Sequence, residues 1–264
     1  MIRKIFILTK IYLNLLITGD WKKLKVEIEY KILHHKNLSR VKNYFFSISE
    51  SLTKRQTDYR LIVYKNFDYK HSNFREIFKK FNSNKGGEWK VRNNLIRHYY
   101  AEFYEEELIN IKVNSLFEIG IGFKNSFPGA SLRAWSEIFP EARIYGADIN
   151  REVLFNEKNI KTFYTDQLSI NELENTKKLL NHEVLDVFID DGLHTFEANI
   201  NTFNVFKNSL SKQGLYFIED IKYTELNKYY KYFINLKNFD FKIIECLNNE
   251  EPNSNIMLIL KKKE

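Results

Sequence analysis

Residue types that break or cross-link a chain are scarce in this sequence of 264 residues. It contains 9 glycines, 3 prolines and one cysteine, Cys246. A single cysteine excludes a disulfide within the chain and is compatible with a reducing cytoplasm, where we expect the protein to act. The shortage of glycine and proline accompanies many Asn, Lys, Ile, Phe and Tyr residues. We interpret this bias as compositional drift rather than as a sign of function.

An apolar run long enough to cross a bilayer is also missing. The best candidate, Ile5 to Ile17, is short and is interrupted by three polar residues. Two basic residues precede it, but no small-residue cleavage site follows. We therefore expect a buried helix of the folded protein here, with a signal peptide or a helix on the membrane surface as the weaker alternatives.

Charge of one sign is in mild excess. The 41 basic and 34 acidic residues give a net charge of +7 and a pI near 9.1. Such a charge suits an anionic small molecule, a membrane surface or nucleic acid, and selects none of them. Hydrophobic residues make up 44% and charged residues 28%, as in ordinary globular proteins.

From residue 114 onward, short apolar stretches alternate with helical patterns, which predicts a doubly wound α/β fold of the Rossmann type. We expect a mostly parallel sheet of seven strands, at 115–122, 142–147, 160–164, 185–189, 215–219, 241–244 and 256–260. This domain should span residues 81–264. Residues 1–80 should form an accessory region that pairs subunits or covers the site, with strand candidates at 24–33 and 59–64. Between the two regions we expect a loop at Gly86-Gly87 and a helix from Leu95 to Ile109.

Acidic residues follow two of the predicted strands. Asp190, Asp191 and His194 follow the strand at 185–189, and Glu219 and Asp220 follow the strand at 215–219. Parallel neighbours would bring Asp191, Glu219 and Asp220 together at one sheet edge. Three carboxylates in one small space need a cation, and hard oxygen ligands suit a divalent metal such as magnesium or manganese. For Asp190, capping the next helix is an equally good interpretation.

The first predicted strand runs into a glycine turn, Gly120-Ile121-Gly122, that would let backbone approach a ligand. Asp148, at the end of the next strand, is placed to hold ribose hydroxyls. NAD is an alternative cofactor, but the third glycine of the dinucleotide motif is replaced by Asn125. Glu118 would instead face a cationic, amino-bearing cofactor, which favours S-adenosylmethionine.

Several segments resemble the metal-dependent sugar O-methyltransferases of antibiotic biosynthesis, including mycinamicin and rhamnosyl O-methyltransferases and the cephalosporin hydroxylase-like group. They are Phe117-Glu118-Ile119-Gly120-Ile121-Gly122, Gly129 to Trp135, Ile144 to Ile149, Asp190-Asp191-Gly192-Leu193-His194 and Ile218-Glu219-Asp220. Asn84-Lys85-Gly86 and His98-x-Tyr100 resemble a further segment that borders the cofactor and substrate. The resemblance covers roughly residues 82 to 222.

The resemblance implies a role for each matching residue. Asp191, Glu219 and Asp220 would bind a magnesium, manganese or iron ion, and His194 would be the general base. The S-adenosylmethionine pocket would be lined by Lys85, Glu118, Gly120, Gly122, Asp148, Ile149, Asp166, Gln167 and Asp190. The acceptor would be a sugar hydroxyl.

Other functions remain open on the sequence alone. A catechol-type methyltransferase would share the metal, and a non-catalytic binding module would share the fold. Methylation of nucleic-acid bases typically uses a Pro-Pro or Pro-Cys segment, which this chain lacks, so we expect no nucleic-acid partner. The positive charge suggests a nucleotide-linked or phosphorylated sugar destined for a capsular or other surface polysaccharide. The accessory region would support a homo-oligomer.

Overall fold

The computed structural model describes residues 61–65, 72–91, 94–122, 127–222, 224–247 and 256–263. The predicted amino-terminal helix and the strand candidate at 24–33 lie outside this part of the chain. Within it, no helix is long and apolar enough to cross a membrane.

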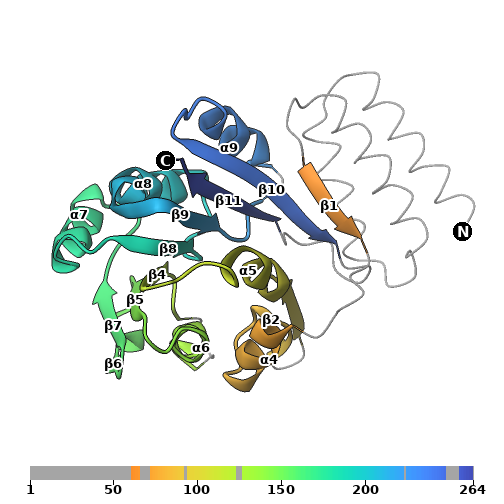
Figure 1. The fold of residues 1–264 in the computed structure, drawn as a ribbon, viewed down its shortest axis with the longest axis vertical. Coiled ribbons are helices and arrows are strands. Elements are labelled where there is room, and N and C mark those ends of the chain that lie inside the picture. Colours follow the sequence, from red (N-terminus) through yellow and green to blue (C-terminus); the bar gives the residue numbers. More distant parts are fainter. Residues whose placement is uncertain are drawn as a thin grey trace, which may run out of the picture. The chain divides into compact units, whose positions relative to one another are not determined.

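The described residues build one large sheet of nine strands in the order β1-β10-β11-β9-β8-β4-β5-β7-β6 (Figure 1). All seven predicted strands are present: β4 (Ser115–Ile119), β5 (Arg143–Asp148), β7 (Ile160–Tyr164), β8 (Leu185–Asp190), β9 (Leu210–Ile218), β10 (Phe239–Leu247) and β11 (Ile256–Lys262). Two short strands extend the sheet at its edges, β1 (Leu61–Lys65) and β6 (Asn156–Glu157). β11 pairs antiparallel with both of its neighbours, whereas β9, β8, β4, β5 and β7 run parallel.

The sheet lies between two layers of helices (Figure 1). One apolar cluster joins the sheet to α4 (Asn73–Lys80), α5 (Ala101–Leu108) and α6 (Ala130–Ile138). The other joins the opposite face to α7 (Ile170–Leu179), α8 (Phe196–Phe206) and α9 (Leu226–Phe233). Successive residues of β8 serve the two faces, since Val187 and Ile189 belong to the first cluster and Phe188 to the second. The predicted doubly wound α/β fold is therefore confirmed.

Two predictions between the accessory region and the sheet were wrong. Gly86-Gly87 is not a loop but the start of β2 (Gly86–Val91), which pairs antiparallel with β3 (Asn94–Tyr99). The predicted helix at 95–109 is strand only as far as Tyr99, and α5 begins at Ala101 and occupies most of the rest. Phe103 and Tyr104 do lie on α5, next to its N-cap Tyr100, and the pairing of the hairpin replaces the helix only before Tyr100.

The accessory role of residues 1–80 remains a prediction. Two elements within them contact the sheet domain: β1 pairs in parallel with β10, and α4 packs against α5 and α6. The compact unit that contains the sheet begins at Tyr59.

Candidate active site

The ends of the parallel strands are tied to one another by backbone hydrogen bonds that continue beyond the strands. Gly120 N–H donates to the carbonyl of Ala147 at 2.8 Å, and Asp191 N–H donates to Ile119 at 2.9 Å. Glu219 N–H then donates to Asp190 at 3.0 Å. These bonds bring the residues after β4, β8 and β9 into one row at the carboxyl edge of the sheet. The row includes the point between β4 and β8 where the chain order reverses, the usual ligand site of open α/β sheets.

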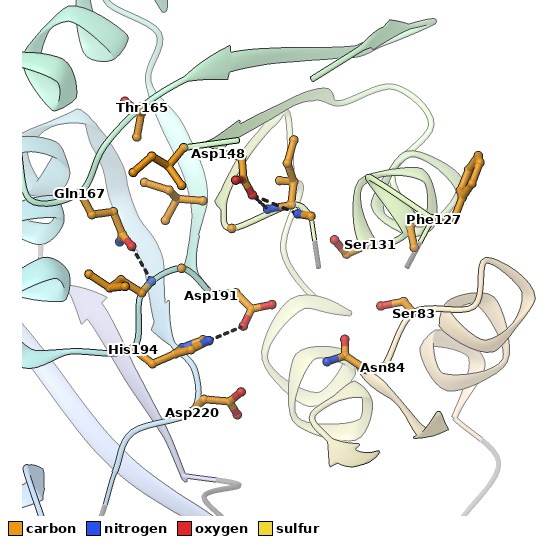
Figure 2. A pocket seen from close by; sticks show the side chains of 18 of the residues that line it. Ser83, Asn84, Phe127, Ser131, Asp148, Thr165, Gln167, Asp191, His194 and Asp220 are labelled. Carbon is orange, nitrogen blue, oxygen red and sulfur yellow. Dashed lines mark hydrogen bonds and ion pairs between the residues drawn. The ribbon is translucent and has the colours of Figure 1, made fainter. Parts of the chain in front are cut away.

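A cavity of about 360 Å³ opens at this edge (Figure 2). That volume suits a small-molecule ligand. Its lining includes predicted site residues at the ends of five strands, β4, β5, β7, β8 and β9: Gly120, Gly122, Asp148, Ile149, Asp166, Gln167, Asp191, His194 and Asp220. Asn82, Ser83 and Asn84, from the turn after α4, also line it, and Figure 2 shows Ser83 and Asn84 across the cavity from His194.

At the lining of this cavity Gly120 makes a close backbone contact that only glycine permits. Gly120 has φ +90°, and a Cβ there would lie 2.0 Å from the carbonyl oxygen of Asp191. Both the left-handed backbone and this contact exclude a side chain. The glycine turn therefore allows the end of β4 to pack directly against the loop after β8. It also leaves backbone groups accessible to a ligand.

Asp148 lines the cavity but directs its carboxylate back at the glycine turn. Its Oδ2 accepts hydrogen bonds from the N–H groups of Ile121 at 3.0 Å and Gly122 at 3.1 Å. Its Oδ1 accepts one from Asn150 N–H at 2.8 Å. In this arrangement Asp148 fixes the shape of the turn, and its predicted contact with ribose remains a prediction.

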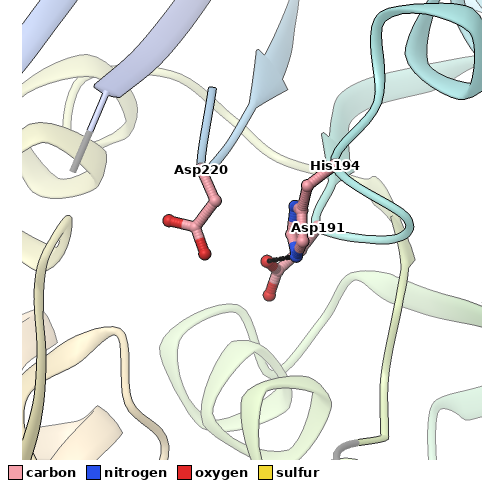
Figure 3. Close-up of side chains that lie close together, drawn as sticks. All are labelled: Asp191, His194 and Asp220. Carbon is pink, nitrogen blue, oxygen red and sulfur yellow. Dashed lines mark ion pairs between the residues drawn. The ribbon is translucent and has the colours of Figure 1, made fainter. Parts of the chain in front are cut away.

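Asp191, His194 and Asp220 come together at one end of the cavity (Figure 3). Each can offer one ligand atom, and these atoms all lie within 4.8 Å of one another. His194 Nε2 lies 3.9 Å from Asp191 Oδ1. Its Nδ1 is buried and has no hydrogen-bond partner among the described residues. Two of the three residues, His194 and Asp220, have φ values of +53°.

Glu219, the third predicted metal ligand, lies behind this cluster. Its side chain is 2% exposed and does not line the cavity. Lys85 Nζ donates to Glu219 Oε1 at 2.7 Å and to Oε2 at 2.8 Å, and the hydroxyl of Tyr104 also donates to Oε1. Burial, followed by the nearby charge of Asp191, raises the pKa of Glu219 well above its usual range.

Lys85 and Glu118 are also enclosed rather than exposed to the cavity. Lys85 is 1% exposed, and its Nζ donates to Asp191 Oδ2 at 2.6 Å. Burial alone would lower the pKa of Lys85, but the surrounding carboxylates outweigh it and raise the pKa. Glu118 is completely buried, accepting from the Trp135 indole at 2.9 Å and lying 3.4 Å from Lys85 Nζ. The amine that faces Glu118 in the structure is therefore that of Lys85.

Asp190 and Gln167 support the loop that carries the site. Gln167 Nε2 donates to Asp190 Oδ1 at 2.7 Å, while Gln167 Oε1 accepts from Leu193 N–H at 2.7 Å. Asp190 is fully buried, outside the cavity lining, and burial raises its pKa. The helix-capping alternative for Asp190 was wrong, because Thr195 caps α8 by accepting from Ala198 N–H.

Three aromatic residues hold the acids, and sequence reasoning did not predict these contacts, although Tyr100 and Trp135 belong to segments that carry the resemblance. Tyr100 donates its hydroxyl to Asp220 Oδ1 at 2.6 Å, Tyr104 bonds Glu219, and Trp135 bonds Glu118. All three are buried. Their spacing predicted that their rings pack in the apolar core, and they do. The ring centroids of Trp135 and Tyr104 are 5.0 Å apart. Nothing in their spacing marked the polar atom of each ring as a partner for a carboxylate.

The sheet order and the site at the strand ends define a Rossmann-like methyltransferase fold. The MycE methyltransferase of mycinamycin biosynthesis, solved in complex with Mg, SAH and mycinamycin VI, has a similar structure. It aligns with a TM-score of 0.56 and 21% identity, over 73% of this chain and 54% of that one.

The chain is homologous to curated sugar O-methyltransferases. It is 33% identical over 127 residues to mycinamicin VI 2''-O-methyltransferase of Micromonospora griseorubida, covering 47% of this chain and 30% of that protein. It is 28% identical over 129 residues to 8-demethyl-8-alpha-L-rhamnosyl tetracenomycin-C 2'-O-methyltransferase of Streptomyces olivaceus, covering 47% and 34%. The chain thus matches about a third of the length of these relatives. No protein-family model matches it.

Proposed function

We propose that the protein is a metal-dependent O-methyltransferase that uses S-adenosylmethionine and acts on a sugar hydroxyl. The observation that carries the proposal is the cluster of Asp191, His194 and Asp220 at one end of a cavity that the glycine turn also lines. The homologous sugar O-methyltransferases give the same reaction class independently.

The residues at the cluster suit a divalent ion. Carboxylate oxygens of Asp191 and Asp220 are hard ligands, and their proximity without a cation would be repulsive. When bound by Asp191 and Asp220, such an ion would act as a Lewis acid that lowers the pKa of an acceptor hydroxyl. Magnesium, manganese and iron all fit this ligand set.

The remaining cavity suits S-adenosylmethionine. No side chain covers the backbone of Gly120 and Gly122, whose turn Asp148 holds in shape, and Asp166 supplies a carboxylate. Ile149 supplies an apolar surface that is 61% exposed. We assign the cofactor to this part of the cavity. Lys85, Glu118 and Asp190, which we had also expected at the cofactor, are buried outside the lining and are not part of this assignment.

His194 is the general base of the proposed reaction. The acceptor hydroxyl would lose its proton to Nε2 of His194 while its oxygen takes the methyl group, so that a C–O bond forms as the C–S bond breaks. Nε2 faces Asp191 across 3.9 Å, whereas Nδ1 is enclosed. A proton on Nδ1 would leave Nε2 as the acceptor, and Asp191 would stabilise the imidazolium that forms.

The acceptor and the place of action remain predictions. The positive charge leads us to expect a nucleotide-linked sugar for a capsular polysaccharide, and the single cysteine leads us to expect action in the cytoplasm. The accessory region leads us to expect a homo-oligomer. The homologues suggest in addition a glycosylated metabolite, because two of them are named for a glycoside that they methylate.

Calorimetry on metal-stripped protein tests the proposal. S-adenosylmethionine should bind, NAD should not, and sugar acceptors should bind only after magnesium or manganese is added. A panel of nucleotide sugars, rhamnosides and a catechol separates the acceptor classes. Absence of S-adenosylmethionine binding would overturn the cofactor assignment, and binding of the catechol alone would replace the sugar.

The ligand assignment is tested by Asp191→Asn, which should weaken manganese binding at least tenfold and leave S-adenosylmethionine binding nearly unchanged. An unchanged manganese titration would remove Asp191 from the ligand set.

A further inference from the structure

Gln167 lines the cavity, but its side-chain amide is engaged by other residues of the chain. The residue is only 6% exposed. Its Nε2 donates to Asp190 Oδ1 at 2.7 Å and to the Thr202 hydroxyl at 3.0 Å. Its Oε1 accepts from Leu193 N–H at 2.7 Å (Figure 2). Both hydrogens of Nε2 are therefore used within the protein, and the amide keeps no donor for a cofactor.

The partners of this amide also fix which way round it lies. The carboxylate of Asp190 accepts hydrogen bonds, and the Thr202 hydroxyl gives its own hydrogen to the carbonyl of Ala198 at 2.9 Å, so it accepts from Gln167. The N–H of Leu193 can only donate. A flipped amide would set oxygen against oxygen on one side and hydrogen against hydrogen on the other, which is costly in a buried place.

The loop that carries His194 packs directly on this amide. A Cβ at Gly192 would lie 2.0 Å from Gln167 Oε1 and 2.7 Å from Gln167 Cδ. The three atoms nearest to that position all belong to the side chain of Gln167. Gly192 does not have a left-handed backbone, so the amide of Gln167 is what opposes a side chain there.

Other contacts hold the two ends of this loop. At its start, Asp191 N–H donates to the carbonyl of Ile119 at 2.9 Å. At its end, Thr195 caps α8 and Phe196 N–H donates to Glu225 Oε2 at 3.2 Å. Gln167 holds the middle of the loop, directly before His194.

We propose that Gln167 is a positioning residue for the general base: its amide, oriented by Asp190 and Thr202, holds the backbone of Gly192 and Leu193 so that His194 keeps the geometry required for methyl transfer. This inference rests on the proposed function of His194. It takes the place of the cofactor contact that we expected for the side chain of Gln167, although Gln167 still lines the cavity.

The backbone of His194 explains why such a hold is needed. Its φ of +53° is unfavourable for a residue with a Cβ and persists only where neighbouring contacts enforce it. Without the bond from Leu193 N–H to Gln167, the loop can relax and the imidazole moves from its place beside Asp191. A displacement of about 1 Å at a reacting group can lower a rate roughly a hundredfold.

Methyl transfer by full-length protein, compared with calorimetric binding of S-adenosylmethionine, tests this role. The reaction uses labelled S-adenosylmethionine, added Mn²⁺ and the panel of sugar acceptors. Gln167→Met keeps the length of the side chain and removes its amide, so kcat should fall at least tenfold while the dissociation constant of S-adenosylmethionine stays within about threefold of wild type. Gln213→Met is the matched control, because Gln213 is exposed on β9 and lies outside the cavity lining. It should leave both quantities unchanged.

An unchanged kcat in Gln167→Met would overturn the inference. Parallel weakening of S-adenosylmethionine binding and turnover would also overturn it, because the side chain would then be a cofactor contact. If wild type transfers no methyl group to any acceptor, the proposed function fails first and this role fails with it. The two failures are therefore distinguishable.

A double-mutant cycle on thermal unfolding tests the contact itself and needs no turnover. Gly192→Ala should lower the melting temperature clearly in the wild-type background, because its Cβ meets the amide of Gln167. In the Gln167→Ala background the same substitution should cost much less, since the smaller side chain leaves room. Additive losses would show that the loop does not rest on Gln167 and would contradict the proposal.

Discussion

At the scale of single residues, the most informative feature is the left-handed backbone at His194 and Asp220. Both have φ +53°, a conformation that costs free energy for any residue with a Cβ. Strain of this kind persists where the surrounding structure enforces it, often at functional sites. Here it turns both side chains toward the same point of the cavity as Asp191.

His194→Ala should reduce methyl transfer at least a hundredfold, because it removes the proton acceptor for the sugar hydroxyl. Binding of S-adenosylmethionine, measured by calorimetry, should stay within about threefold of wild type. Loss of both turnover and cofactor binding would contradict the role of His194 as base.

The strain itself can be measured with glycine. His194→Gly should raise the free energy of unfolding by about 1 kcal/mol, since glycine adopts positive φ without steric cost. His182→Gly is the matched control, with φ +60° and an exposed side chain away from the site. Urea denaturation should show a similar gain for both variants, and only His194→Gly should lose turnover. A loss of stability at His194 would show that the histidine side chain, not the backbone, dominates there.

At the scale of elements, strand ends carry the site. Val187, Phe188 and Ile189 of β8 are fully buried, which is why an uninterrupted apolar run marked this strand in the sequence. The acids after it could be predicted for the same reason, since polar chemistry begins where the buried strand stops. Asp191 and Asp220 were predicted to converge, and they do.

The contact of Lys85 with the acids could not be predicted in this way. Lys85 reaches Asp191 across 106 positions of sequence, and only the packing of α4 and the β2–β3 hairpin brings it there. Local spacing does not encode such a contact. The hairpin itself was missed because the helical spacing of the aromatic residues of α5 was extended backwards into β3, and local sequence does not show the pairing of Gly87 with His98.

The contact between β4 and the loop after β8 predicts a strong effect of Gly120→Ala. Its Cβ would meet the Asp191 carbonyl at 2.0 Å, so the loop must move. Unfolding free energy should fall by at least about 2 kcal/mol, with loss of S-adenosylmethionine binding. Gly214→Ala is the comparison, because a Cβ there lies 3.0 Å from its nearest neighbour and its φ is not left-handed. An equal effect of the two substitutions in denaturation would contradict the special role of Gly120.

At the scale of the whole molecule, the buried acids make stability depend on pH. Burial raises the pKa values of Asp190, Glu118 and Glu219 above their ordinary ranges. The folded state then binds protons more tightly than the unfolded chain. Each of these acids therefore lowers the free energy of unfolding as pH rises from its unfolded pKa through its folded pKa.

Asp190 allows this effect to be isolated, because it lies outside the metal cluster and its unfolded pKa is near 3.8. Asp190→Asn should become progressively more stable relative to wild type as pH rises above that value, since the variant has no charge to bury. Urea denaturation at intervals between about pH 4 and pH 8 measures this difference. Parallel curves for the two proteins would show that Asp190 has an unshifted pKa.

The most direct measurement of the central claim is transfer of the methyl group itself. Full-length protein is incubated with isotopically labelled S-adenosylmethionine and a panel of nucleotide sugars and rhamnosides, with excess chelator or with added magnesium or manganese. We expect label on a sugar oxygen only when metal is present, and none with Asp191→Asn. Label transfer that is equally fast in excess chelator would contradict the metal-dependent mechanism, and no transfer to any sugar under either condition would contradict the proposed acceptor.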